Sequence, residues 1–227
     1  MIKLLIFDFD GTLADTHRLI IETNREAMRR MGFPVLEEPV ISRTIGLPLE
    51  EGILTMFPQL TKEDLPAWTS TYRRIFDQLK TQIIPGLFPR VKETLEALHA
   101  EGFVLTVASS RLSVSLNAFL KDMGIAPYFS YVLGADNVSL AKPNPEPVLK
   151  TLRDLQFRAD ETLVVGDMPV DILMGERAGA FTCGVTYGNS TREALKEAGA
   201  NHILDDFGAA HIAKVDVEVG HRDALRV

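Results

Sequence analysis

An apolar run that ends in two aspartates near the N-terminus constrains the fold of this chain more than any other feature. Residues 4–7 are Leu-Leu-Ile-Phe, and Asp8 and Asp10 follow, separated by Phe9. A short, wholly apolar run is typical of a strand buried on both faces of a parallel sheet. Because side chains alternate along a strand, both aspartates are expected to point the same way at its carboxyl end, where open α/β sheets bind ligands. Two carboxylates there are costly unless positive charge lies between them, so the run predicts a ligand site.

A structural turn is the alternative interpretation of the same segment. Asp10-Gly11 is a dipeptide typical of tight hairpin turns. The residues that follow do not alternate as a returning strand would. Instead, Ile20, Ala27 and Met31 recur at helical spacing, so we favour a strand followed by a helix.

The composition allows a large core and disfavours several classes of function. The chain has 227 residues, 46% of them hydrophobic, and a formal net charge of −7, which disfavours a general nucleic-acid binder. No apolar run approaches the roughly 18 residues of a membrane helix, and the first residues lack a signal-peptide pattern. The single cysteine, Cys183, lies in an apolar run and cannot form an internal disulfide. We therefore expect a cytoplasmic protein with neither nucleic-acid nor membrane partners.

Two kinds of pattern divide the chain. Residues 16–85 have helical signals and few strand signals, and Pro85-Gly86 marks their end. After it, strands alternate with helices, and we expect strands at 103–108, 131–133, 163–165, 181–185 and 202–204. This order predicts the α/β class, a doubly wound parallel sheet (a Rossmann-like core) with an inserted helical cap domain. We assign residues 1–15 and 86–212 to the core, assign 16–85 to the cap, and leave the tail 213–227 unassigned.

Capping residues predict where two of the core helices begin. Asn144 precedes Pro145, a favourable cap followed by proline at the first helical position. Ser190 with Glu193 has the spacing of a capping box.

Polar residues also follow the second and third expected strands. Ser109 and Ser110 end the apolar run 103–108, and their hydroxyl and N–H groups could hold a phosphate-like anion near a helix start. A simple helix cap is the alternative for Ser109. Lys142 precedes Pro143, and although a loop lysine is usually solvated, its place after the third strand favours a role in the site.

Asp167 and Asp171 repeat the acidic ending of the first strand. Gly166-Asp167 follows the run 163–165, and Asp171 falls in the first turn of the next helix. A favourable charge at a helix N-terminus explains either acid alone, but not acids after two separate strands.

The four aspartates and Lys142 would form a pocket with a net negative charge, in which repulsion raises some carboxylate pKa values. A hard divalent cation with oxygen ligands resolves this conflict. Magnesium (Mg²⁺) fits, because it takes one or two carboxylates together with waters and a phosphate oxygen.

These residues resemble the motifs of the haloacid dehalogenase superfamily of phosphohydrolases. In chain order the four motifs are Asp8-Phe9-Asp10-Gly11-Thr12, Ser109, Lys142-Pro143, and Gly166-Asp167 with Asp171. The resemblance covers residue 3 to about residue 207, and it matches the subgroup with a helical cap after the first motif. Asn24, residues 43–46 and residues 85–86 look like the phosphoglycolate phosphatase branch.

The resemblance implies a role for each motif. Asp8 would be the nucleophile that forms an aspartyl-phosphate, and Asp10 would protonate the leaving group and then activate water. Ser109 and Lys142 would bind the transferring phosphoryl group. Asp8, the backbone oxygen of Asp10 and Asp167 would hold Mg²⁺, with Asp171 in support. Backbone N–H groups from Phe9 to Gly11 could also contact phosphate oxygens, and Thr12 would brace the turn.

We therefore expect a Mg²⁺-dependent phosphatase that hydrolyses a small phosphorylated metabolite, such as a phosphoglycolate-like monoester, as a monomer or homodimer. A β-phosphoglucomutase-like mutase and an inorganic pyrophosphatase remain alternatives on the same fold. The mutases carry a His soon after the first motif, whereas here His17 comes too early and Ile20 takes the later place. A dehalogenase is disfavoured, because that branch has no acid at the position of Asp10.

A phosphorylatable, non-catalytic receiver-like module is the alternative from another class, but such modules are about half this length and lack an inserted cap. Substrate choice is expected to lie in the cap. Arg43, Arg73 and Arg74 are the candidates there, although arginines on helix surfaces are common.

Overall fold

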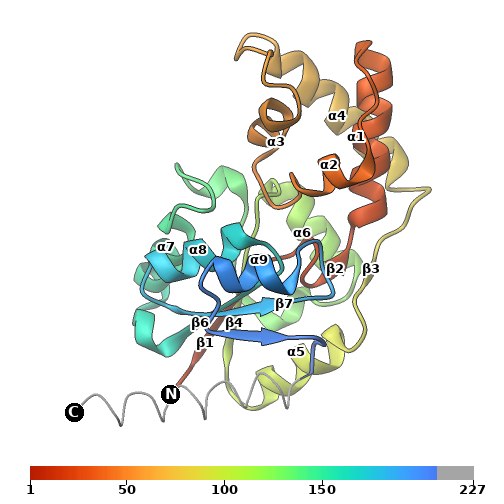
Figure 1. The fold of residues 1–227 in the computed structure, drawn as a ribbon. Helices are drawn as coiled ribbons and strands as arrows, with labels where there is room; N and C mark the ends of the chain where they lie inside the picture. Colours follow the sequence, from red (N-terminus) through yellow and green to blue (C-terminus); the bar gives the residue numbers. More distant parts are fainter. Residues whose placement is uncertain (209–227) are drawn as a thin grey trace.

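A computed structural model describes residues 1–208 of the chain (Figure 1). The last residues assigned to the core, 209–212, and the unassigned tail, 213–227, lie outside the described residues. None of the helices within residues 1–208 combines the length and the apolar character needed to cross a membrane.

A six-stranded parallel sheet forms the centre of the α/β part, in the order β5-β4-β1-β6-β7-β8. The strands are β1 (Leu4–Phe7), β4 (Val104–Ala108), β5 (Phe129–Leu133), β6 (Thr162–Gly166), β7 (Phe181–Val185) and β8 (His202–Leu204). Phe7 at the end of β1 pairs with Val107 on one side and Val165 on the other, so these three strands end level with one another. The predicted doubly wound parallel sheet is confirmed.

Helices cover both faces of the sheet because alternate residues of β1 belong to two different cores (Figure 1). Leu5 and Phe7 pack with α5 (Val91–Ala100) and α6 (Ser113–Asp122). Leu4 and Ile6 pack on the opposite face with α7 (Glu146–Leu155) and α8 (Pro169–Arg177). All four β1 residues are fully buried, which explains an apolar run that does not alternate with polar residues.

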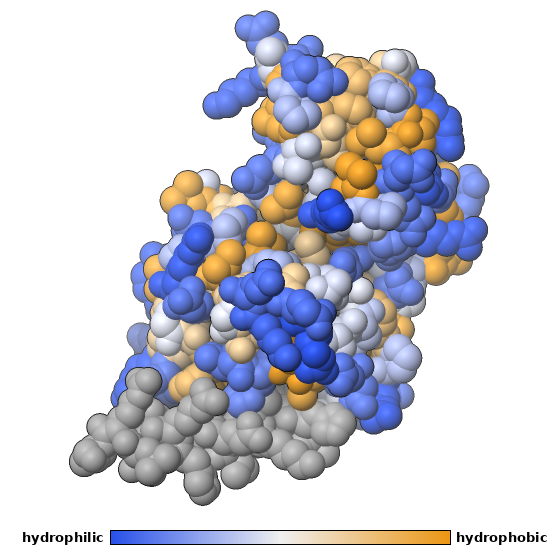
Figure 2. Space-filling model, in the orientation of Figure 1, coloured by the Kyte–Doolittle hydropathy of each residue, from blue (hydrophilic) through white to orange (hydrophobic). Residues whose placement is uncertain are grey.

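Four helices lie between the short antiparallel strands β2 (Ala14–Asp15) and β3 (Gly86–Leu87), and we call residues 16–85 the cap segment. The helices are α1 (His17–Met31), α2 (Glu38–Ser42), α3 (Leu49–Met56) and α4 (Leu65–Leu79), gathered at one end of the molecule (Figure 1). They enclose a core of their own, in which Trp68 packs against Phe33 and Phe57 with ring centroids 5.2 and 5.3 Å away. On the face drawn in Figure 2, hydrophobic residues are most visible over these helices. The boundaries of a separate cap domain stay a prediction.

Within residues 1–208, the remaining elements are the helix α9 (Arg192–Glu197) and three short 3-10 helices. The short helices are η1 (Ala126–Tyr128), η2 (Ala135–Asn137) and η3 (Ala159–Glu161). The predicted start of α9 was wrong by one residue. Thr191, not Ser190, caps α9 through its hydroxyl, because Thr191 has the extended backbone that a cap requires. Helix α7 begins after Pro145, and Asn144 Oδ1 accepts the N–H of Glu146 at 3.0 Å.

Candidate active site

The candidate active site lies at the carboxyl ends of β1 and β6, where the strand order reverses. The chain passes from β1 to β4 and β5 on one side of the sheet, and from β6 to β7 and β8 on the other. Asp8 follows β1 directly, and Asp167 follows β6. The crevice at such a reversal is where open α/β sheets bind ligands.

Three acids and one lysine meet at this point. Asp8, Asp167 and Asp171 each offer a carboxylate oxygen, and these oxygens lie within 4.8 Å of one another. All three side chains are buried, as is Lys142. Lys142 Nζ donates to Asp8 Oδ1 and to Asp171 Oδ1, in both cases at 2.6 Å. One ammonium against three carboxylates leaves the cluster with an excess of negative charge.

Burial and mutual repulsion shift the pKa values of this cluster. Burial raises the pKa of Asp8 well above its usual range; Lys142 opposes the rise and Asp171 adds to it. Burial, followed by the charge of Asp171, raises the pKa of Asp167 to about 7. Burial by itself lowers the pKa of Lys142, but Asp171 and Asp8 outweigh it, so the net pKa is raised. Full ionisation of the three carboxylates would therefore place more negative charge here than Lys142 compensates.

One of the two carboxylate oxygens of Asp8 is left for a ligand. Its Oδ1 accepts from Lys142, but its buried Oδ2 has no hydrogen bond within the described residues. A buried carboxylate oxygen without a partner is costly, and hard divalent cations bind such oxygens. The all-oxygen donor set of the cluster suits a cation of this kind.

Asp171 has both of its oxygens engaged. Oδ1 accepts from Lys142, and Oδ2 accepts the backbone N–H of Met168 at 3.0 Å, which closes the first turn of α8. The two interpretations of Asp171 from the sequence are therefore compatible, because the same carboxylate stabilises a helix start and holds the lysine.

Asp167 is fixed by residues from two other segments. Thr12 Oγ1 donates to its Oδ1 at 3.0 Å, and the backbone N–H and Nδ2 of Asn189 donate to its Oδ2 at 2.7 and 2.9 Å. Gly11 has a φ of +87°, and a Cβ there would lie 2.2 Å from both Asp167 Oδ2 and Asn189 Nδ2, so only glycine fits. Asn189 was not among the site residues predicted from the sequence. Its place after the strand β7 could have indicated it, because this puts Asn189 at the same edge of the sheet as the aspartates.

Asp10 lies at the same edge but does not join the cluster. Arg111 donates to it from Nε (to Oδ2, 3.1 Å) and from Nη2 (to Oδ1, 2.5 Å), and Thr16 Oγ1 donates to Oδ1 at 2.7 Å. Because β1 ends at Phe7, strand alternation no longer fixes the directions of the next residues. Arg111 was not predicted from the sequence either, although it stands two residues after Ser109.

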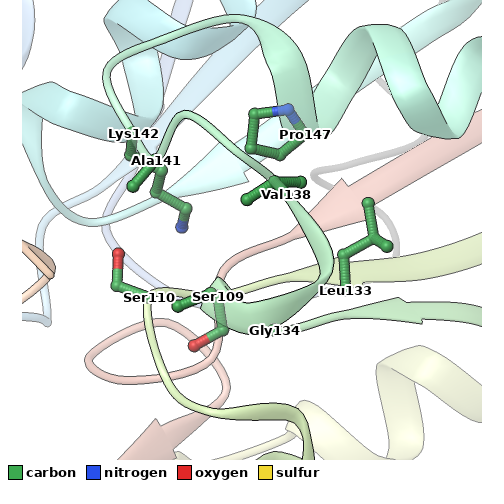
Figure 3. Close-up of a pocket in the computed structure, with 9 residues that line it drawn as sticks. Ser109, Ser110, Leu133, Gly134, Val138, Ala141, Lys142 and Pro147 are labelled. Atoms are coloured by element: carbon green, nitrogen blue, oxygen red, sulfur yellow. The ribbon is translucent and has the colours of Figure 1, made fainter.

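The two serines after β4 make different contacts, and their hydroxyls point apart in Figure 3. Ser109 Oγ accepts the N–H of Arg111 at 3.2 Å. It does not cap α6, whose first N–H, that of Ser113, is bonded to Asp136 instead. Ser110 Oγ donates to the carbonyl oxygen of Gly46 in the cap segment at 2.6 Å, so its hydroxyl hydrogen is already used.

The candidate phosphate contacts are Lys142, Ser109 and nearby backbone groups. Lys142 and both serines line one small pocket, in which the lysine nitrogen points toward the serine segment (Figure 3). Within residues 1–208, no acceptor is found for the N–H of Phe9 or of Ser110. The N–H of Gly11 is bonded to Ala14 O at 2.9 Å, so it is not available.

The cap segment touches the site at several points. These contacts are Gly46 with Ser110, His17 Nδ1 with Asn189 Oδ1 at 2.7 Å, and the ring of Phe76 at 4.9 Å from the guanidinium carbon of Arg111. The predicted cap arginines are not among them. Arg43, Arg73 and Arg74 are exposed, and no hydrogen bond or ion pair joins them to the cluster within the described part of the chain.

Comparisons with known proteins agree with this geometry. Residues 5–185 match the family model described as haloacid dehalogenase-like hydrolase. A probable phosphatase IndB from Dickeya dadantii is 39% identical over 93% of this chain and 94% of its own. A phosphoglycolate phosphatase from Vibrio cholerae is 33% identical over 91% and 94%. A putative haloacid dehalogenase-like hydrolase from Bacteroides fragilis has a TM-score of 0.86 at 27% identity, covering 92% of this chain and 100% of that one. Proteins named pyrophosphatase PpaX and putative β-phosphoglucomutase are also among the matches.

Replacing Asp167 with Asn should stabilise the metal-free protein and abolish its thermal response to Mg²⁺. The amide oxygen can face Asn189 while the amide nitrogen donates to the Thr12 hydroxyl, so the change removes charge and keeps the hydrogen bonds. For a chain of this size, each 1 kcal/mol of relieved repulsion raises Tm by about 2–4 °C. Thermal unfolding with chelator and with Mg²⁺ measures both effects, and the exposed Asp122→Asn is the matched control. A wild-type Mg²⁺ response retained in Asp167→Asn would contradict the assignment.

The metal-free protein should lose stability as the pH rises from about 4 to 7. The pKa of Asp167 is about 7 in the folded protein against a usual value of 3.8. Between these values the native state binds more protons than the unfolded state, so the free energy of unfolding falls with rising pH. Urea unfolding with chelator, across this range, tests the slope. Asp167→Asn should flatten it, and identical slopes for the two proteins would contradict the expectation.

Proposed function

This chain belongs to the haloacid dehalogenase-like hydrolases and is a phosphatase, and we propose that it hydrolyses a small phosphomonoester with Mg²⁺ through an aspartyl-phosphate on Asp8. One observation carries the proposal. Asp8 is a buried carboxylate with one oxygen held by Lys142 and the other without a hydrogen bond within the described residues. Such a carboxylate can attack phosphorus once the repulsion between the two anions is offset.

In the proposed reaction, Asp8 acts as the nucleophile and Asp10 transfers the protons. An oxygen of Asp8 attacks the phosphorus while the bond from phosphorus to the leaving oxygen breaks, and Asp10 gives that oxygen its proton. Asp10 then takes a proton from a water molecule, whose oxygen attacks the phosphorus and releases Asp8 with inorganic phosphate. The separate surroundings of the two carboxylates support this division, because Asp8 is held by Lys142 and Asp10 by Arg111.

Lys142, Ser109 and the N–H groups of Phe9 and Ser110 would hold the phosphoryl oxygens. These groups are donors that the surrounding protein leaves wholly or partly unused, and phosphoryl transfer depends mainly on such positioning and charge stabilisation.

Asp8, Asp167 and the backbone oxygen of Asp10 would hold Mg²⁺. Asp167 Oδ1 accepts one hydrogen bond, from Thr12, and so keeps a lone pair for a cation. Asp171 would support the site by holding Lys142, since both of its oxygens are already engaged. The ion would neutralise charge on the phosphoryl group and on Asp8.

A phosphoglycolate-like monoester is the substrate class we propose, and a phosphoglycolate phosphatase is among the similar proteins. A mutase is disfavoured because both ring nitrogens of His17 have partners, Asn189 and Glu38, and Ile20 cannot transfer protons. Pyrophosphate hydrolysis is the second candidate, favoured by the similar protein named pyrophosphatase PpaX. The receiver-like alternative is set aside, since the family is one of hydrolases. We also propose a cytoplasmic location, which the lone buried thiol of Cys183 supports.

Asp8→Asn should abolish release of inorganic phosphate without unfolding the protein. The amide is a poor nucleophile, so we expect a loss of at least about 10³-fold. Release of inorganic phosphate over many turnovers, with Mg²⁺ present, measures the loss of activity. Circular dichroism checks that the variant is folded. Full activity in the folded variant would remove Asp8 from the nucleophile role.

A panel of substrates should place phosphoglycolate above sugar phosphates, nucleotides and pyrophosphate in kcat/KM. The comparison isolates the leaving group, because every substrate presents the same phosphoryl group to Asp8 and Lys142. A sugar phosphate or pyrophosphate that ranks far above phosphoglycolate would overturn the substrate class and leave the nucleophile unchanged.

A further inference from the structure

We propose that Arg111 is a positioning residue for Asp10, whose carboxylate it fixes for both proton transfers of the reaction. The inference rests on the proposed function, because that function gives Asp10 its two proton transfers. Arg111 lies outside the acid cluster, in the loop between β4 and α6.

The guanidinium fixes both oxygens of Asp10. Arg111 contacts Oδ2 through Nε at 3.1 Å and Oδ1 through Nη2 at 2.5 Å, and its Nη1 donates to Ser115 Oγ at 3.2 Å. The two side chains are only 9% and 12% exposed. Oδ1 accepts a second bond from Thr16, whereas Oδ2 accepts only the Nε donor. Oδ2 therefore keeps a lone pair, and it is the oxygen suited to exchange a proton.

An aromatic cage holds Arg111 in this place. The ring centroids of Phe9, Phe76 and Phe119 lie 5.8, 4.9 and 4.9 Å from its guanidinium carbon, within the range of cation–π attraction. Phe119 also packs against both of the other rings. Phe76 belongs to α4 of the cap segment, and Phe9 follows β1 beside the nucleophile. The position of Asp10 therefore depends on contact between the cap segment and the core.

The role of Arg111 can be separated from general stability by the leaving group. An alkoxide leaving group needs a proton from Asp10, whereas para-nitrophenolate leaves with little proton assistance. Hydrolysis of the aspartyl-phosphate needs Asp10 as a base for every substrate. A misplaced Asp10 should therefore slow formation of the intermediate only for alkyl esters, and slow its hydrolysis for both kinds of ester.

The test compares Arg111→Met and Arg111→Lys with wild type, using phosphoglycolate and para-nitrophenyl phosphate with Mg²⁺. Methionine removes the positive charge and the two-point contact with Asp10, but it keeps an apolar side chain among the three aromatic rings. Arg111→Met should lower kcat/KM about 100-fold for phosphoglycolate and less than about 10-fold for the nitrophenyl ester. With the nitrophenyl ester, Arg111→Met should also show an initial burst of about one nitrophenol molecule per active site. Wild type should show no such burst. Arg111→Lys should recover part of the phosphoglycolate loss.

Two further variants complete the test. Arg153→Met makes the same change at an arginine on α7 whose side chain is 71% exposed, and it should leave both rates unchanged. Phe76→Leu weakens the cage without touching Asp10, and it should shift the ratio of the two rates in the same direction by a smaller factor. If Arg111→Met does not fold, Arg111→Lys and Phe76→Leu decide the question through that ratio. Equal losses on both esters without a burst would overturn the inference. A wild-type protein that hydrolyses neither ester would instead overturn the proposed function.

Discussion

A cluster of three buried carboxylates, two of which are bonded to one ammonium group, is the constraint around which the rest of the structure is arranged. Lys142 connects its own loop to β1 through Asp8 and to α8 through Asp171, with both contacts at 2.6 Å. Buried ion pairs of this kind carry a large desolvation cost, so a fold that keeps them needs the groups held accurately and bonded well. The level ends of β1 and β6 and the first turn of α8 hold them in place. The excess negative charge that remains is what a divalent cation would offset.

A second ion pair keeps two neighbouring aspartates chemically distinct. Asp8 accepts a hydrogen bond from Lys142, whereas Asp10, two residues later, accepts hydrogen bonds from Arg111 and Thr16. A nucleophile and a proton carrier need different surroundings, and here two different basic side chains, Lys142 and Arg111, supply them. The cap segment contacts the surroundings of both Asp167 and Asp10. His17 is hydrogen-bonded to Asn189, and the ring of Phe76 packs against Arg111. Contact between the cap segment and the core therefore bears directly on the arrangement of the reacting groups.

The parts of the structure that could be predicted are those that local pattern determines. Wholly apolar runs predicted the buried strands, and acids directly after two such runs predicted that Asp8 and Asp167 would meet, because parallel strands end at one edge. Partnerships between loops could not be predicted in this way. Arg111 and Asn189 are ordinary polar loop residues in the sequence, and only the folded chain shows that they hold Asp10 and Asp167. Adjacent hydroxyl residues likewise left the start of α9 ambiguous, since local pattern does not distinguish Ser190 from Thr191.

The most direct measurement is to identify the residue that carries phosphate during turnover. Wild-type protein turning over a phosphomonoester with Mg²⁺ would be quenched rapidly in acid, digested, and analysed by mass spectrometry. If Asp8 is the nucleophile, one phosphoryl group appears on the peptide that contains Asp8, and it disappears when substrate is exhausted. Continued turnover with phosphate on another side chain, or with no phosphorylated peptide under any quench condition, would contradict the role given to the acid cluster.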